Sequence, residues 1–205
     1  KRKVALVGGG PAGMEFARIC AQRGHDVTLY EKSGELGGML KHAKYPSFKW
    51  PLRQFMDYMI KEMDKLGVHV KLNTTATHEL LEKDNYQVLA LALGAEPSSL
   101  PLPGKDGDNV SYAANIYGHE DTLGKNVTII GGGEIGVETA LYLCELGKRV
   151  TVLEILPELI ADAPHAHYKN MVHNYWRKQP NFHFQCGVKV TSIDPDGVNF
   201  TDHKG

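Results

Sequence analysis

The sequence predicts an α/β fold built from two βαβ units, and an internal repeat is the main reason. Residues 4–31 align without a gap with residues 127–154. Each copy reads as a short buried β-run, a glycine turn, a helix that ends at glycine, and a second β-run that ends at glutamate. The content of 42% hydrophobic and 23% charged residues is that of an ordinary globular chain. The repeat therefore sets the predicted architecture.

The first repeat copy contains a glycine turn of the form GxGxxG, made by Gly8, Gly10 and Gly13 directly after a β-run. In this layout the first glycine permits a tight turn, the second lets the backbone approach a pyrophosphate, and the third allows close helix–strand contact. The phosphates would face unpaired N–H groups and the positive end of the helix dipole. Glu31 ends the second β-run, where its carboxylate can accept both hydroxyls of an adenosine ribose. This copy is therefore predicted to bind a dinucleotide.

The second repeat copy follows the same logic with Gly131, Gly133, Gly136 and Glu154. Two such sites in one chain favour a relay, because a hydride passes from a nicotinamide to a second redox cofactor only when both are held in contact. An enzyme is therefore favoured over a passive binder.

The segment between the copies predicts a helix over 51–66, a strand over 68–72 and a strand over 88–93. The helix carries one apolar stripe that we expect to face the core, and its members are Leu52, Phe55, Met56, Met59, Ile60, Met63 and Leu66. The stretch 96–124 is rich in Pro, Gly, Ser and Asp, so it reads as the connection between two domains.

Charge and composition exclude several classes of partner. A net charge of -1 gives no electrostatic reason to expect binding to nucleic acid or to an anionic membrane. No apolar run reaches the length of a membrane span, and the chain opens on a strand pattern instead of a signal peptide. We therefore expect small-molecule partners and a cytoplasmic protein.

The cysteines and histidines suggest neither disulfides nor a metal. Three cysteines lie far apart and form no CxxC pair, which fits a reducing compartment: Cys20, Cys144 and Cys186. Three histidines have spacings that could ligate a metal, but no cysteine or acid completes the set: His165, His167 and His173. No metal site is expected.

The motifs resemble those of the two-dinucleotide-binding-domain flavoproteins. GGGPAG at the first turn is typical of that family's FAD site, and GELGGML over 34–40 resembles its second flavin segment. By this resemblance the FAD site comprises Gly8, Gly10, Pro11, Ala12, Gly13, Glu31, Lys32, Gly37, Gly38, Met39, Ala76, Ala92 and Gly94, with Ala76 near the adenine. The implied NAD(P)H site comprises Gly131, Gly133, Glu134, Ile135, Gly136, Glu138 and Glu154, with Glu138 beside the nicotinamide.

Nearly the whole chain resembles the C-terminal reductase region of NADH oxidases and enoate or 2,4-dienoyl-CoA reductases of the old-yellow-enzyme type. The resemblance rests on the strand segment 67–74 and on GGGEIGVE at the second turn. It implies an FAD-binding domain over 1–112 and an NAD(P)H-binding domain over 113–205, both truncated. It also implies a missing upstream region with FMN and an iron–sulfur cluster. Hydride would pass from NADH to FAD, without a catalytic side chain.

Other readings stay open at this stage. A glutamate-synthase small-subunit type shares the GPAG and LGG segments, and a nucleotide-binding module without turnover would carry the same glycine turns. Disulfide reductases are disfavoured, because no reactive cysteine pair is present. NADH is expected over NADPH, since Glu154 would repel a 2′-phosphate and no arginine or lysine stands among residues 155–157. Surfaces exposed by truncation are expected to promote self-association.

Overall fold

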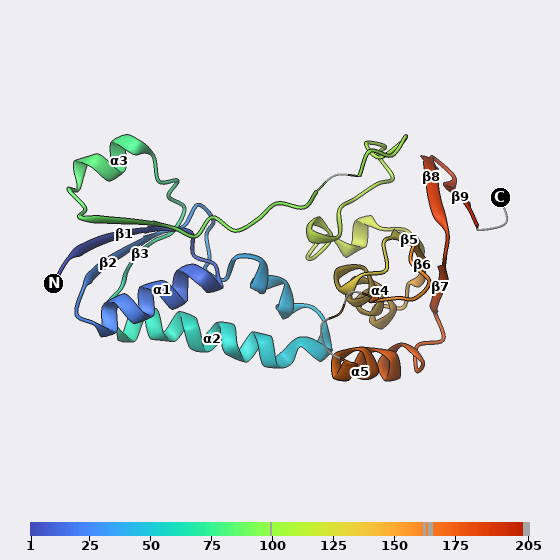
Figure 1. Ribbon diagram of the computed structural model, residues 1–205, viewed down its shortest axis with the longest axis horizontal. Coiled ribbons are helices and arrows are strands. Elements are labelled where there is room, and N and C mark those ends of the chain that lie inside the picture. The colour runs from blue at the N-terminus through green and yellow to red at the C-terminus, as the bar shows by residue number, and fades with distance from the viewer. Residues whose placement is uncertain (99, 162, 164–165, 203–205) are drawn as a thin grey trace. The chain divides into compact units, whose positions relative to one another are not determined.

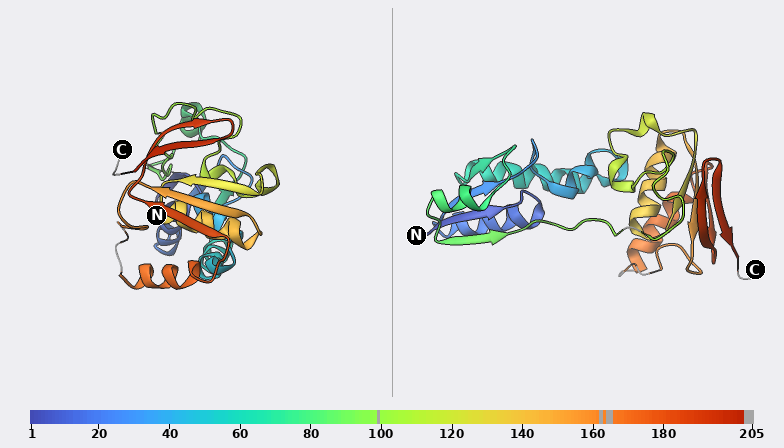
Figure 2. Two further views of the ribbon diagram at one scale, coloured as in Figure 1. Left: turned by 90° about the vertical axis from the view of Figure 1, so that its right-hand side faces the viewer. Right: turned by 90° about the horizontal axis from the view of Figure 1, so that it is seen from above.

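The computed structural model describes residues 1–98, 100–161, 163 and 166–202. Each of two compact units, 1–97 and 98–205, carries its own parallel sheet, as Figures 1 and 2 show. The predicted α/β class is therefore confirmed. The division falls inside the predicted connection, and the assignment of 1–112 to FAD and 113–205 to NAD(P)H stays a prediction.

The first unit is a parallel sheet of order β3-β2-β1-β4. Its elements are β1 (Lys3–Val7), α1 (Pro11–Gln22), β2 (Asp26–Tyr30), η1 (Gly38–Lys44), η2 (Ser47–Lys49), α2 (Trp50–Lys65), β3 (His69–Lys71), α3 (His78–Lys83) and β4 (Val88–Leu91). Helix α1 begins at a proline, which suits a first helical turn, and is followed by Gly24 with φ 81°. The repeat therefore predicted both ends of this helix.

The core of the first unit lies between the sheet and helices α1 and α2. Leu6 and Leu29 from the strands pack with Met14, Met59 and Met63 from the helices, and all five side chains are fully buried. Burying an aliphatic side chain of this size contributes roughly 1.5–3 kcal/mol relative to exposure. This core fixes the carboxyl ends of β1 and β2, where the first glycine turn lies.

The apolar stripe predicted for α2 is only partly buried. Met56, Met59 and Met63 are buried, but Leu52 and Phe55 are 42% and 47% exposed. The first turns of α2 extend past the strands, as Figure 1 shows, so the sheet does not cover them. The prediction that the whole stripe faces the core was therefore wrong at its N-terminal end.

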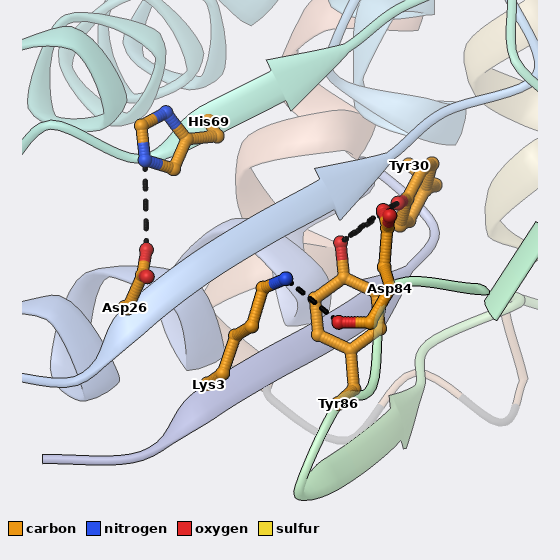
Figure 3. Close-up of polar contacts among 6 residues, drawn as sticks. All are labelled: Lys3, Asp26, Tyr30, His69, Asp84 and Tyr86. Atoms are coloured by element: carbon orange, nitrogen blue, oxygen red, sulfur yellow. Dashed lines mark hydrogen bonds and ion pairs between the residues drawn. The ribbon is translucent and has the colours of Figure 1, made fainter. Parts of the chain in front are cut away.

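A hydrogen-bonded cluster of tyrosines and an aspartate joins β2 to the segment before β4 (Figure 3). The Tyr30 hydroxyl is hydrogen-bonded to the Tyr86 hydroxyl at 2.8 Å and donates to the Asp84 carboxylate at 3.2 Å. Lys3 Nζ donates to the Asp84 carbonyl at 2.7 Å and lies 4.9 Å from the centre of the Tyr86 ring. Burial, together with these neighbours, raises the pKa of Tyr30. The cluster fixes β4 beside β1.

The second unit repeats the βαβαβ order in a parallel sheet of order β5-β6-β7. An antiparallel hairpin, β8-β9, follows it. The elements are η3 (Ala113–Asn115), η4 (Glu120–Thr122), β5 (Asn126–Ile130), α4 (Glu134–Glu145), β6 (Arg149–Glu154), α5 (Ala166–Trp176), β7 (Phe182–Cys186), β8 (Lys189–Asp194) and β9 (Gly197–Thr201).

Two tyrosine–glutamate hydrogen bonds join helices α4 and α5. The Tyr168 hydroxyl donates to Glu138 at 2.8 Å, and the Tyr175 hydroxyl donates to Glu145 at 2.6 Å. The partners are spaced two helical turns apart on both helices, so the helices lie alongside one another. Glu138 is therefore held by a residue of α5.

The predicted connection is not a free linker, because most of it packs onto the second unit. The Pro103 carbonyl accepts from Ile193 N–H at 2.9 Å, and Asn109 donates to the Asp194 carbonyl at 2.9 Å. Gly104 has φ +82°, and a Cβ there would lie 1.8 Å from the Ile193 carbonyl oxygen. Only glycine allows so close an approach.

Candidate functional site

The first glycine turn is held at the carboxyl end of β1 by three backbone contacts. Gly8 N–H donates to the Tyr30 carbonyl at 2.9 Å, and Gly9 N–H donates to the Glu31 carboxylate at 2.7 Å. The Gly9 carbonyl accepts from Gly37 N–H at 2.8 Å. Gly9 is the middle glycine of the run Gly8–Gly10. It is therefore hydrogen-bonded through both its N–H and its carbonyl.

The second glycine turn is held by the equivalent contacts. Gly131 N–H donates to the Leu153 carbonyl at 2.9 Å, and Gly132 N–H donates to the Glu154 carboxylate. The Gly132 carbonyl accepts from Ile160 N–H at 2.7 Å. The two repeat copies therefore share a hydrogen-bonding pattern as well as a sequence pattern.

Each glutamate uses both carboxylate oxygens on backbone N–H groups. The second oxygen of Glu31 accepts from Ser33 N–H at 2.8 Å, and that of Glu154 accepts from Leu156 N–H at 2.7 Å. Both side chains are buried, at 8% and 7% exposure. For Glu31, burial works against ionisation, but the donors Ser33 and Gly9 outweigh it and lower the pKa. This carboxylate therefore stays ionised.

The bracing role of the glutamates does not exclude the predicted contact with ribose. A carboxylate offers about four lone-pair sites, so two backbone donors leave room for ribose hydroxyls on Glu31 and on Glu154. In the structure each glutamate also holds its glycine turn in place. The contact with ribose stays a prediction.

The third glycine of each turn is required by close contact. A Cβ on Gly13 would lie 1.9 Å from the Gly8 carbonyl oxygen, and a Cβ on Gly136 would lie 2.0 Å from the Gly131 carbonyl oxygen. Real Cβ atoms do not approach backbone this closely, so any other residue would push the helix away from the turn. This is the close helix contact that the spacing predicts.

The surroundings of the first and second glycines differ between the units. A Cβ on Gly8 would lie 2.2 Å from the Ala92 carbonyl oxygen, and one on Gly10 would lie 3.8 Å from the Gly38 Cα. A Cβ on Gly131 or on Gly133 would meet nothing within 4 Å. The second turn is therefore the more open of the two.

An open hollow lies at the second turn. Its volume is about 390 Å³, and it is lined by Gly132, Gly133, Glu134, Glu154, Ile155, Leu156, Ile160, Ala161 and Ala163. A second hollow of about 290 Å³ also touches Ile155 and is lined by Gly187, Lys189, Thr201 and Asp202. Backbone N–H groups at the start of α4 and a buried carboxylate thus border one space, as a dinucleotide requires.

The remaining residues of the predicted NAD(P)H site lie in the glycine turn or in the first turns of α4. Gly131 and Gly136 form the turn, and Ile135 is 71% exposed in the first turn of α4. Glu138, one turn further along α4, accepts a hydrogen bond from Tyr168 of α5. Its predicted place beside the nicotinamide is untested.

Several of the predicted FAD residues contact the first turn, and the others follow them in the chain. Pro11 and Ala12 begin α1, and the backbone of Gly38 lies against Gly10. Thr74 N–H donates to the Glu31 carbonyl at 2.9 Å, which brings the loop with Ala76 towards the end of β2. The other members border these segments: Lys32 follows Glu31, Met39 is 57% exposed in η1, and Gly94 has φ +77° after β4.

Sequence reasoning missed the residues that hold the middle glycine. Leu36 packs on Gly9 and Leu159 packs on Gly132, since in each case the leucine Cδ2 would lie 2.5 Å from an added Cβ. The sequence does contain a signal for these two leucines. The ungapped alignment of the repeat copies continues past the glutamates and matches Glu35–Leu36 with Glu158–Leu159.

The structure shows no sign of a metal site or of disulfide chemistry within the residues that it describes. No group of three or more candidate ligands occurs among them, and their cysteines are free. His173 packs edge-on against Trp176 with ring centres 5.0 Å apart, and His165 lies outside the described residues. None of the described helices is both long and apolar enough to cross a membrane.

Two braced glycine turns on parallel sheets are the features of a dinucleotide-binding protein. The chain belongs to the pyridine nucleotide-disulphide oxidoreductase family, whose model matches residues 2–205. The predicted class, an FAD-dependent NAD(P)H oxidoreductase, is therefore confirmed.

Two relatives and one solved structure show where the similarity lies. The chain is 35% identical over 209 residues to an NADH oxidase of Thermoanaerobacter brockii, covering 100% of this chain and 32% of the relative. It is 40% identical over 159 residues to a cinnamate reductase of Clostridium sporogenes, covering 78% and 24%. A 2-naphthoyl-CoA reductase complex matches all of this chain and 31% of its own, with TM-score 0.94 and 36% identity.

The chain spans about a third of the length of the NADH oxidase that it matches. The predicted resemblance to the reductase region of NADH oxidases and enoate-type reductases is confirmed by these relatives.

The different roles of the second and third glycines give a prediction. Gly136→Ala should destabilise the second unit by about 2–4 kcal/mol, because its Cβ would clash with backbone. Gly133→Ala should change stability by less than about 0.5 kcal/mol but weaken NADH binding, because its Cβ would enter the space of the pyrophosphate. Urea unfolding and calorimetric titration measure the two effects. Equal destabilisation by the two variants would contradict this account.

Proposed function

We propose that the chain transfers a hydride from NADH, bound at the second glycine turn, to FAD, bound at the first. The observation that carries this proposal is the duplicated brace, in which a buried glutamate holds the middle glycine of each turn. Two pre-formed dinucleotide sites in one chain suit a relay between two redox cofactors.

The residues at both turns fit dinucleotides. Gly10 and Gly133 have no Cβ to keep a pyrophosphate away from the N-termini of the 12-residue helices α1 and α4. Glu31 and Glu154 would accept ribose hydroxyls with their remaining lone pairs. When bound, the nicotinamide and the flavin supply the hydride chemistry, so the protein contributes orientation and electrostatics.

The parent protein is proposed to be an enzyme of the NADH oxidase or enoate reductase type, acting in the cytoplasm. The named relatives are an NADH oxidase, a cinnamate reductase and a 2-naphthoyl-CoA reductase. An upstream region with FMN and an iron–sulfur cluster would complete the relay.

The second site is proposed to prefer NADH to NADPH because of Glu154. Its carboxylate is 7% exposed, so a 2′-phosphate would meet a poorly screened negative charge. One pair of unit charges about 4 Å apart at an effective dielectric near 20 costs on the order of 4 kcal/mol. Lys189 lines the neighbouring hollow, but Asp202 lines it too, so the two charges offset each other there.

We expect the 205-residue chain to bind NADH about tenfold more tightly than NADPH. Calorimetric titration with both cofactors tests this, and Glu154→Gln should reduce the difference because it removes the charge. In the presence of excess FAD and without oxygen, NADH should bleach flavin absorbance faster than in a protein-free control. Equal or tighter NADPH binding would sink the NADH assignment, and a bleaching rate equal to the control would sink the relay.

Self-association of the chain is proposed to involve the outward face of β4. Leu89, Leu91 and Leu93 alternate along this segment and are 51%, 64% and 70% exposed. Alternation places these side chains on one face, and an apolar face of this kind favours association.

Leu91→Lys should therefore lower the apparent mass of the chain at high concentration. Sedimentation velocity of this variant and the parent chain measures the change. A matched substitution at an exposed isoleucine outside this face, Ile135→Lys, should leave the mass unchanged. A parent chain that is monomeric over the whole concentration range would refute the proposal.

A further inference from the structure

Ile160 has a backbone conformation that its side chain disfavours. Its φ is 49°, in the left-handed region, where β-branched residues are rare. The other described non-glycine residues with positive φ are Asn73 and Asn85, and asparagine tolerates this region. Strain of this kind persists only where the surrounding structure enforces it, and it clusters at ligand-binding segments.

The contacts of Ile160 explain what enforces the conformation. Its N–H donates to the Gly132 carbonyl at 2.7 Å, and the residue is 2% exposed. The preceding residue, Leu159, packs directly on Gly132. Residues 159 and 160 therefore hold the middle glycine from its carbonyl side, while Glu154 holds its N–H.

The first unit makes the same hydrogen bond without the strain. There Gly37 donates to the Gly9 carbonyl at 2.8 Å with φ 121°, a conformation that glycine adopts freely. The next residue, Gly38, packs so closely that a Cβ on it would lie 2.9 Å from Gly10 Cα. The backbone of Gly37 and Gly38 therefore packs against the first turn.

The second unit places a large side chain where the first has glycine. Ile160 and Ala161 line the hollow at the turn, and a Cβ on Gly133 would meet nothing within 4 Å. Because a glycine at position 160 would make the same hydrogen bond without strain, the hydrogen bond alone does not account for isoleucine. Isoleucine therefore adds a buried side chain beside the hollow that glycine would not supply.

We propose that Ile160 is a positioning residue of the second dinucleotide site. Its constrained backbone fixes the Gly132 carbonyl, and its buried side chain packs beside the hollow at the turn. The N–H groups of the turn are then presented to the pyrophosphate in one conformation, which reduces the ordering that binding must impose. The inference rests on the proposed binding of NADH at this turn.

The test compares substitutions at Ile160 with a matched substitution of the second unit away from the hollow. Ile160→Gly removes the strain and the side chain, Ile160→Ala keeps the strain but shortens the side chain, and Ile160→Val is conservative. The control is Leu146→Ala, because Leu146 is 50% exposed at the C-terminal end of α4 and does not line the hollow. NADH affinity is measured by calorimetry and thermal stability by circular dichroism on each folded variant.

We expect Ile160→Gly and Ile160→Ala to weaken NADH binding on the order of tenfold, and Ile160→Val and Leu146→Ala to stay within about twofold. Should the glycine variant not fold, the alanine variant decides. A loss of thermal stability with unchanged NADH affinity would overturn the inference, because it would show a purely structural role. Failure of the parent chain to bind NADH would instead overturn the proposed function and this inference with it.

Discussion

A buried carboxylate that accepts the N–H of the middle glycine is the interaction on which both sites depend. In each unit this contact joins the end of the second strand to the turn after the first strand, through Glu31 and Gly9 or through Glu154 and Gly132. A buried carboxylate is costly unless it is hydrogen-bonded, and backbone donors on both oxygens meet that requirement. For Glu31 these donors outweigh burial and lower the pKa, so this carboxylate remains charged at low exposure.

The shared brace leaves the surroundings of the turns free to differ. In the first unit, the Ala92 carbonyl approaches so closely that Gly8 cannot carry a side chain, and Gly38 packs against Gly10. In the second unit the equivalent glycines are open, and a hollow is lined by Ile160 and its neighbours. The same glutamate–glycine contact thus supports two sites of different shape. Two different shapes suit the proposed relay between two different dinucleotides.

Local patterns in the sequence predicted most of the two βαβ units and their glycine turns. Glycine spacing, helix-ending glycines and strand-ending glutamates gave both βαβ units, because these features depend on neighbours along the chain. The exposure of Leu52 and Phe55 was not predictable, since helical periodicity gives a stripe but not the length of the sheet beneath it. The packing of Gly104 on Ile193 depends on a contact distant in sequence. The left-handed backbone of Ile160 contradicts its local preference, so only tertiary contacts could reveal it.

Amide hydrogen exchange at Gly9 and Gly132 tests the central claim most directly. The brace predicts that both amides are protected in the ligand-free chain. Glu31→Ala should remove protection at Gly9 while leaving it at Gly132 and at core amides such as that of Leu6. Exchange of Gly9 and Gly132 at the rate of unprotected amides, or unchanged protection at Gly9 in the variant, would contradict the account.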